Sequence, residues 1–118
     1  MWAVELKENG QLIGDCGITM QNIHGNLEPE IGYHINKKYQ KQGYATEAAA
    51  ACIKYAFEIL NFTKVYSYMK YTNEASARVA MKNGMHFVDE YEDPVNIITK
   101  VYAICREEWE EVTGSNRV

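Results

Sequence analysis

Apolar and polar residues alternate along the first part of the chain, a pattern typical of strands. Residues 2–7 alternate in this way, and residues 8–10 (Glu-Asn-Gly) follow as a hairpin signal, because Asn-Gly tolerates positive φ. The same pattern predicts a return strand over residues 11–20, a polar loop over 21–26 and a third strand over 30–35. The chain is therefore expected to begin as an antiparallel meander.

A helical pattern follows an irregular polar stretch over residues 36–43. It covers residues 44–60, where Thr46 and Glu47 favour a helix start because a hydroxyl and a negative charge suit the first turn. One face of this helix carries small and apolar residues: Ala49, Cys52, Ile53, Ala56 and Leu60. We expect this alanine-rich face to lie close on a sheet.

The second half of the chain continues with strands and a second helix. Tyrosine and valine are frequent in residues 64–71, which predicts a strand. Asn73 then caps a helix that ends before Gly84. The remaining predicted elements are a strand over 85–89, a turn at Asp93 and Pro94, a strand over 97–105, a short helix over 106–112 and a frayed tail over 113–118.

The predicted order is strand, strand, strand, helix, strand, helix, strand, strand. A meander that passes into a strand–helix–strand crossover predicts an α+β (mixed α/β) fold. Its sheet would be mixed and mostly antiparallel, with two principal helices on its faces. The 118 residues suit one domain, which we place at residues 1–112.

Composition narrows the classes of function. The hydrophobic fraction of 47% and the charged fraction of 24% are those of a soluble globular protein. The net charge of −4 argues against nucleic acid as the main partner, although Lys37, Lys38 and Lys41 form a local basic patch. The sequence contains no long apolar run that could span a bilayer, so no membrane partner is expected.

The three cysteines, Cys16, Cys52 and Cys105, are widely spaced and include no C-x-x-C pair. This spacing fits a reduced, cytoplasmic protein better than a disulfide scaffold. The simpler interpretation is that they are small buried residues, and a nucleophilic cysteine is the alternative. The three histidines lack the spacing of metal ligands, so we expect no metal site.

Residues 40–45 (Gln-Lys-Gln-Gly-Tyr-Ala) link the third strand to the first helix and carry the main candidate chemistry. The first N–H groups of a helix have no intrahelical partners and attract anions. Gly43 lets a diphosphate approach the backbone, and Ala45 keeps the next turn lean. Side chains that add donors or positive charge stand beside them: Lys38, Gln40, Lys41 and Gln42. An ordinary strand–helix connection is the alternative interpretation.

Two familiar phosphate loops are absent, since neither G-x-x-x-x-G-K-[ST] nor G-x-G-x-x-G occurs. Residues 40–45 instead resemble the Q/R-x-x-G-x-G/A signature of the GNAT superfamily of N-acetyltransferases. Further segments resemble its Rim-type branch, which acetylates protein N-termini and related amines: residues 30–33, 43–48, 73–76, 84–87 and 107–109. The resemblance covers nearly the whole chain, with the motifs in the right order.

The resemblance implies acetyl-CoA as co-substrate, bound where the strands before and after the first helix splay apart. Its pantetheine arm would lie against the backbone of Tyr33, His34 and Ile35, with the Tyr33 N–H as donor to the thioester carbonyl. The loop would hold the pyrophosphate through Gln40, Lys41, Gln42, Gly43, Tyr44 and Ala45. Asn73 would bond the pantetheine with its side-chain amide, and a plain helix cap is the open alternative.

The resemblance also implies direct attack of an amine on the thioester, with the leaving thiolate stabilised or protonated. Many relatives carry a tyrosine acid seven residues after the pantetheine asparagine, and Ala80 stands there instead. Ser76 or Tyr71 could act near the sulfur, although a polar residue in a helix first turn is equally ordinary. Glu30 or Glu28 could act as the base through water, with solvated surface carboxylates as the alternative.

The resemblance breaks at the N-terminus. Family members usually begin with a strand and two helices that wall the amine-acceptor site, whereas this chain starts at the hairpin, about 50–60 residues later. A start at an internal methionine, a wall supplied by a second subunit, and a reduced form that binds acyl-CoA without transferring it are three open explanations. The exposed sheet edge also favours pairing with another chain, as in a homodimer.

The sequence therefore predicts an acetyl-CoA-dependent N-acetyltransferase that acts on a primary amine, at a protein N-terminus or in a small molecule. A non-catalytic acyl-CoA-binding or interaction module of the same fold is the alternative. A mixed α/β domain with no CoA site is a third hypothesis. We expect the polar loop over residues 21–26 to contribute to the choice of acceptor.

Overall fold

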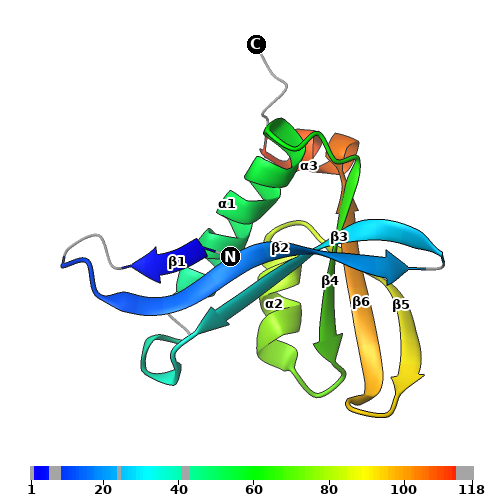
Figure 1. The fold of residues 1–118 in the computed structure, drawn as a ribbon, viewed down its shortest axis with the longest axis horizontal. Helices are drawn as coiled ribbons and strands as arrows, with labels where there is room; N and C mark the ends of the chain where they lie inside the picture. Colours follow the sequence, from blue (N-terminus) through cyan, green and yellow to red (C-terminus); the bar gives the residue numbers. More distant parts are fainter. Residues whose placement is uncertain (1, 6–8, 24, 41–42, 114–118) are drawn as a thin grey trace.

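The computed structural model describes residues 2–5, 9–23, 25–40 and 43–113. Its strands form one six-stranded sheet in the order β1-β2-β3-β4-β6-β5 (Figure 1). The strands are β1 (Trp2–Glu5), β2 (Leu12–Ile23), β3 (Asn26–Ile35), β4 (Lys64–Lys70), β5 (His86–Asp93) and β6 (Ile97–Cys105). The helices are the 3-10 turn η1 (Lys37–Tyr39), α1 (Tyr44–Glu58), α2 (Glu74–Lys82) and α3 (Arg106–Thr113).

The predicted fold class and the order of elements are confirmed. Neighbouring strands pair antiparallel except β3 and β4, which are parallel and joined through α1. The boundaries of β6 match the prediction, and α3 extends one residue beyond it, to Thr113. The rest of the predicted tail, residues 114–118, lies outside the described residues, as do residues 6–8 of the first predicted strand and turn.

The predicted polar loop over residues 21–26 is wrong. β2 continues to Ile23 and β3 already begins at Asn26, so the two strands form one long hairpin that closes around Gly25, whose φ is 85°. The Asn22 side chain accepts a hydrogen bond from the Gly25 N–H at 3.0 Å. Gln21, Asn22 and Asn26 are polar and exposed, so no apolar pattern marks these strand ends. They are held by backbone hydrogen bonds between β2 and β3.

Two other boundaries also differ from the prediction. β5 runs from His86 to Asp93 instead of over residues 85–89, and most of its side chains are exposed, so it lacks the alternation of a half-buried strand. α1 ends at Glu58, and Leu60 is 43% exposed instead of lying on the buried helix face. Phe57 takes that place in the core and is fully buried.

α1 and α2 cover one face of the sheet, and the core lies beneath them (Figure 1). The predicted small-residue face of α1 is otherwise confirmed, because Ala49, Cys52, Ile53 and Ala56 are all buried. The Phe57 ring packs against Trp109 of α3, with ring centroids 5.3 Å apart. Short side chains on α1 thus let it lie directly on β2 and β3.

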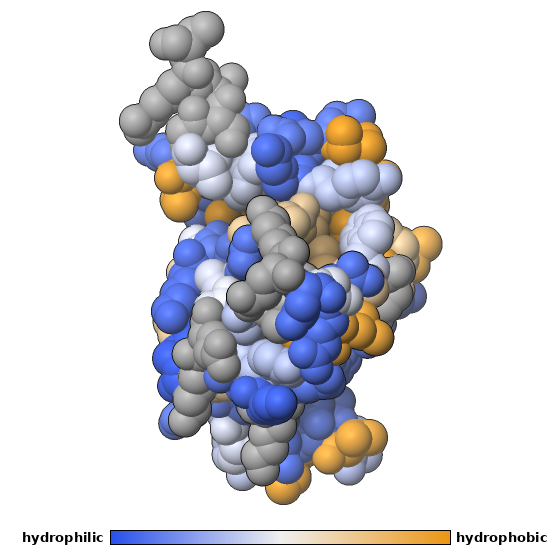
Figure 2. All heavy atoms as spheres, turned by 90° about the vertical axis from the view of Figure 1, so that its left-hand side faces the viewer, coloured by the Kyte–Doolittle hydropathy of each residue, from blue (hydrophilic) through white to orange (hydrophobic). Residues whose placement is uncertain are grey.

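The surface seen from the β1 side is mainly hydrophilic, and its apolar side chains gather in separate patches (Figure 2). None of the helices in the described ranges combines the length and apolarity that a bilayer crossing requires.

Candidate functional site

β3 and β4 part soon after they meet. Within the described residues their ladder contains a single pairing, Glu30 with Tyr66, whereas β2 and β3 pair continuously from Gly14–Ile35 to Ile23–Asn26. In Figure 1 the strands β1, β2 and β3 run across the view and β4, β6 and β5 run along it. The predicted splayed strand pair is therefore present, and the second half of β3 borders a gap.

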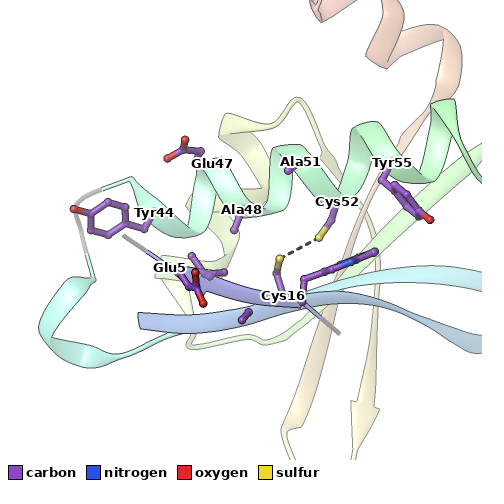
Figure 3. A pocket seen from close by; sticks show the side chains of 11 residues that line it. Glu5, Cys16, Tyr44, Glu47, Ala48, Ala51, Cys52 and Tyr55 are labelled. Carbon is purple, nitrogen blue, oxygen red and sulfur yellow. Dashed lines mark hydrogen bonds between the residues drawn. The ribbon is translucent and has the colours of Figure 1, made fainter. Parts of the chain in front are cut away.

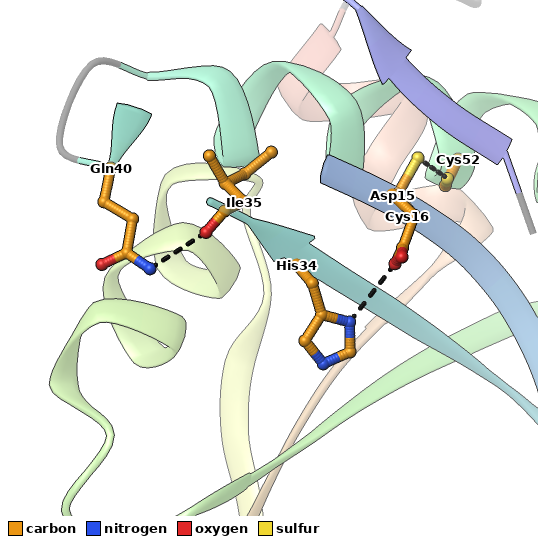
Figure 4. Close-up of polar contacts among 6 residues, drawn as sticks. All are labelled: Asp15, Cys16, His34, Ile35, Gln40 and Cys52. Atoms are coloured by element: carbon orange, nitrogen blue, oxygen red, sulfur yellow. Dashed lines mark hydrogen bonds and ion pairs between the residues drawn. The ribbon is translucent and has the colours of Figure 1, made fainter. Parts of the chain in front are cut away.

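The backbone of β3 offers an N–H group to this gap. The Ile31 carbonyl accepts a hydrogen bond from the Ser67 hydroxyl at 3.4 Å, and the Ile35 carbonyl accepts one from the Gln40 amide at 3.0 Å (Figure 4). Both carbonyls therefore point away from β2. Because backbone groups alternate in direction along a strand, the Tyr33 N–H points the same way, into the gap.

His34 has the opposite orientation. Its backbone alternates toward β2, where it is in register with Asp15, so the structure does not bring it to the gap as predicted. Its side chain projects from the other side of β3 than Ile35 does, and its Nδ1 lies 3.3 Å from an Asp15 carboxylate oxygen (Figure 4). Tyr33 and Ile35 are the predicted pantetheine contacts that the geometry favours.

The Tyr33 side chain connects the two sides of the gap. Its hydroxyl donates a hydrogen bond to the Ser76 carbonyl of α2 at 3.0 Å. Burial raises the pKa of the Tyr33 phenol above its usual value, hydrogen bonds with the Ser67 and Ser76 side chains oppose that rise, and the Glu30 carboxylate adds to it. The phenol is thus protonated at neutral pH and lies beside Ser76, the residue predicted to act near the sulfur.

α1 begins without a side-chain cap among the described residues. Its N-cap is Gly43, with φ 84° and ψ 0°, and the first helical bond runs from the Glu47 N–H to the Gly43 carbonyl at 3.0 Å. The N–H groups of Tyr44, Ala45 and Thr46 precede that bond and have no intrahelical acceptor. Free donors of this kind can bind an anion, and the pyrophosphate role of this helix start remains a prediction.

Gly43 leaves the space beside these donors open. A Cβ built on it would meet no heavy atom of the described residues within 4 Å, and its left-handed φ is one that L side chains rarely adopt. A diphosphate could therefore approach the backbone closely. The predicted contacts Lys41 and Gln42 lie outside the described residues.

Gln40 braces the loop. One of its amide hydrogens is bound to the Ile35 carbonyl, which fixes the loop to the end of β3 (Figure 4). This contact holds Gln40 at the end of β3, shortly before the start of α1 in the chain. The sequence had suggested Gln40 as a pyrophosphate donor, and that role remains a prediction.

Asn73 is the N-cap of α2, as predicted. Its side-chain oxygen accepts a hydrogen bond from the Ser76 N–H at 3.1 Å, which leaves its NH₂ group to donate elsewhere. A cavity of about 280 Å³ adjoins it and is also lined by Tyr71. Ala80 is 1% exposed and belongs to the core, so this position supplies no hydroxyl.

Glu30 stands where β3 pairs with β4, the single such pairing within the described residues, and the gap opens beyond it. Burial raises the pKa of its carboxyl group, and hydrogen bonds from the Gln21 side chain and the Tyr68 backbone oppose that rise. Glu28 lies two residues earlier on the same face, in register with Gln21. Of the two predicted bases, Glu30 is therefore the one nearer the gap.

A second cavity, of about 650 Å³, lies between β1 and α1 (Figure 3). Cys16 and Cys52 point toward each other in it, with their sulfur atoms 3.2 Å apart. Burial, reinforced by Cys16, raises the pKa of Cys52 to about 12, so its thiol stays protonated and unreactive. Sequence reasoning missed this cavity because its walls, including Trp2 and Tyr55, are distant in the chain.

Comparison with known proteins agrees with this geometry. The model of the acetyltransferase (GNAT) domain matches residues 1–86. The uncharacterized protein YkkB of Bacillus subtilis (strain 168) is 41% identical over 87 residues, which cover 74% of this chain and 51% of YkkB. The uncharacterized N-acetyltransferase YnaD of the same organism is 32% identical over 120 residues, covering 90% of this chain and 64% of YnaD.

Solved structures show the same fold. A GNAT-family acetyltransferase from Bacillus anthracis superposes with a TM-score of 0.76 at 30% identity, and the match covers 89% of this chain and 65% of that one. The chain thus spans about half to two thirds of the length of these similar proteins.

Proposed function

The chain belongs to the GNAT acetyltransferase family, and we propose that it transfers an acetyl group from acetyl-CoA to a primary amine. The observation that carries this proposal is the uncapped start of α1 beside the gap between β3 and β4. The first N–H groups of α1 can bind an anion, and the backbone of β3 beyond Glu30 has N–H and C=O groups that do not pair with β4. Acetyl-CoA has a pyrophosphate and an amide-rich arm, which suit these two surfaces.

The residues divide the work of binding. The N–H groups of Tyr44 and Ala45, beside Gly43, would hold the pyrophosphate, with Lys41 and Gln42 contributing from the same loop. The backbone of Tyr33 and Ile35 and the Asn73 amide would hold the pantetheine arm. The open space beside Gly43 and the N–H donors next to it fit a pyrophosphate. The resemblance to the family supports both the pyrophosphate and the pantetheine contacts.

The reaction forms one C–N bond and breaks one C–S bond. The amine nitrogen attacks the thioester carbonyl, and the Tyr33 N–H stabilises the oxygen as negative charge develops on it. Glu30 would accept the proton lost by the amine, through a water molecule. The departing sulfur takes a proton from one of two hydroxyl groups that lie together, the Ser76 hydroxyl or the Tyr33 phenol. Orientation in the gap supplies a large part of the acceleration.

The acceptor and the assembly are finer parts of the proposal. The resemblance of residues 73–76 to the Rim-type branch supports a protein N-terminus, and a small amine is the other acceptor class. β1 lies at an edge of the sheet, which supports pairing with a second copy of the chain.

A non-catalytic acyl-CoA-binding module is the second candidate. The observation that favours it is Ala80, which is buried and offers no acid where many relatives carry tyrosine. Such a module would bind acetyl-CoA through the same gap and leave the thioester intact.

Two measurements on the purified chain test the proposal. Acetyl-CoA at a hundred times its dissociation constant should raise the melting temperature by about 10 °C, because a ligand of the native state then adds about 2.7 kcal/mol. A panel of primary amines should then release free CoA thiol. An absent thermal shift overturns the proposal, and a shift without thiol release from any amine supports the binding module.

A further inference from the structure

Tyr33 presents two hydrogen-bond donors in directions roughly at right angles. Its backbone N–H lies in the plane of the sheet and points into the gap between β3 and β4. Its side chain stands on the face that α1 and α2 cover, because it packs against the core cluster, as does its register partner Cys16. A thioester whose oxygen accepts from the N–H would therefore have the Tyr33 ring beside it, on the side of the helices.

The Tyr33 hydroxyl reaches the flank of α2 that borders the gap. It donates a hydrogen bond to the Ser76 carbonyl at 3.0 Å. In an α-helix that carbonyl also accepts the Ala80 N–H, so the phenol lies beside Ala80. A long side chain at position 80 would point back over the turn that contains Ser76. Ala80 offers only a methyl group, which leaves that place to the ring from β3.

This hydrogen bond can be exchanged for a stronger one. The Ser76 carbonyl keeps its bond within the helix when the phenol turns away, so no buried group loses its last partner. A hydrogen bond to an ionised acceptor is roughly twice as strong as one between neutral groups. A thiolate that forms within reach of the Tyr33 hydroxyl would therefore attract its proton.

Two serine hydroxyls support the phenol oxygen. Burial raises the pKa of the Tyr33 phenol and the Glu30 carboxylate adds to that rise, whereas hydrogen bonds with the Ser67 and Ser76 side chains oppose it. Ser67 is buried, and its hydroxyl also bonds the Ile31 carbonyl at 3.4 Å. Because hydroxyl groups rotate, both serines can turn toward negative charge on the phenol oxygen. An aliphatic alcohol is a far weaker acid than a phenol, so Tyr33 is the better proton donor of the three.

We infer that the Tyr33 phenol binds and protonates the leaving CoA sulfur, so that one residue serves the thioester oxygen through its N–H and the sulfur through its side chain. This inference rests on the proposed function. The amine nitrogen forms the C–N bond and loses a proton to Glu30 through water. The electron pair of the broken C–S bond stays on sulfur, which takes the phenol proton. Tyr33 then regains a proton from solvent, and Glu30 releases one.

The first experiment needs no acceptor. CoA is bound to the purified chain and its thiol is titrated by the ultraviolet absorbance of the thiolate, with desulfo-CoA as the blank. A donated hydrogen bond favours the ionised thiol. The pKa of the bound CoA thiol should therefore be about one unit higher in Tyr33→Phe than in the unmodified protein. An equal pKa in the two proteins overturns the inference.

The second experiment measures CoA release with hydroxylamine as a small probe acceptor. Tyr33→Phe keeps the ring and the backbone N–H, so acetyl-CoA affinity should stay within about twofold, whereas kcat should fall about 100-fold. Ser76→Ala keeps the carbonyl that holds the phenol and should lower kcat only about threefold. A larger loss of kcat in Ser76→Ala than in Tyr33→Phe would make the serine the donor and overturn the inference.

Tyr55 provides the matched control. It lies on the other flank of α1, beside Trp2, and is 39% exposed. Tyr55→Phe removes the same hydroxyl group and should leave kcat and the pKa of the bound CoA thiol unchanged. Equal losses of kcat in Tyr55→Phe and Tyr33→Phe would show a general effect and overturn the assignment.

The outcomes separate this inference from the proposed function. If neither acetyl-CoA nor CoA stabilises the unmodified protein, the proposed function fails. CoA binding without thiol release from hydroxylamine or any amine of the panel overturns both the transfer and this role of Tyr33. If the unmodified protein releases thiol and Tyr33→Phe does so equally fast, only this inference fails.

Discussion

The two main helices of this protein begin in different ways. α2 starts at Asn73, whose side chain accepts the hydrogen bond of the Ser76 N–H and so satisfies one of the free donors of the first turn. α1 starts at Gly43, which has no side chain to do this. A glycine in place of a capping side chain costs a helix only about a few tenths of a kcal/mol, so α1 can begin without a cap at little cost. α2 thus satisfies a donor of its own first turn, whereas α1 has no side-chain cap among the described residues, and we propose that its donors bind the ligand.

Substitution of Gly43 should produce the largest effect on this difference. In Gly43→Trp the indole would occupy the open space beside the first-turn donors, so acetyl-CoA affinity should fall at least about 100-fold, or about 2.7 kcal/mol. The variant should also lose about 1–2 kcal/mol of unfolding free energy, because an L side chain is strained at a left-handed φ. Thermal melts with and without acetyl-CoA measure both quantities.

Gly25 offers a matched control for that experiment. Its φ of 85° is close to the 84° of Gly43, and a Cβ on either would meet no heavy atom of the described residues within 4 Å. Gly25→Trp should therefore cost similar stability and leave acetyl-CoA affinity unchanged. Equal loss of affinity in both variants would mean that strain, not occupation of the α1 start, is responsible, and the contrast between the helix starts would fail.

The Asn73 cap should show a smaller and separable effect. Asn73→Ala should lose about 1 kcal/mol of unfolding free energy with its cap. Asn73→Asp keeps the oxygen that accepts from the Ser76 N–H but removes the NH₂ group, so it should retain stability. Its acetyl-CoA affinity should nevertheless fall about three- to tenfold, the value of one hydrogen bond. Chemical denaturation and ligand titration on the same samples separate the two roles.

Asn73 would be a structural cap alone if Asn73→Asp bound acetyl-CoA as tightly as the unmodified protein. In that case the two helix starts would differ more clearly. The start of α1 would bind the ligand, and Asn73 would only cap α2.

Local signals allowed these helix starts to be predicted from the sequence. Asn73 precedes one helical pattern and Gly43 precedes an alanine-rich one. Each helix start is therefore determined by residues close to it in the sequence. The exposed hairpin around Gly25 and the strand β5 were misjudged because backbone pairing with distant strands maintains them. No apolar alternation marks such elements.

In the candidate site, too, local features could be predicted from the sequence and features that depend on distant strands could not. The family resemblance pointed to Tyr33 and its neighbours, but only the alternation of bonds along β3 separates Tyr33 from His34. Tyr68 of β4 and Tyr91 of β5 likewise meet across β6, a contact between strands that are not neighbours in the chain. Both tyrosines are visible in the sequence, but their contact cannot be read from it.

The smallest expected effect uses inorganic pyrophosphate alone. At a concentration near its dissociation constant it should stabilise the unmodified protein by about 0.4 kcal/mol, a rise in melting temperature of about 2 °C. Strongly hydrated anions also stabilise proteins without binding, so the informative quantity is a difference between variants. Asn73→Ala should keep the full rise and Gly43→Trp should lose the specific part, because only the α1 start would bind the anion. Identical rises in the two variants would place any pyrophosphate binding elsewhere on the molecule.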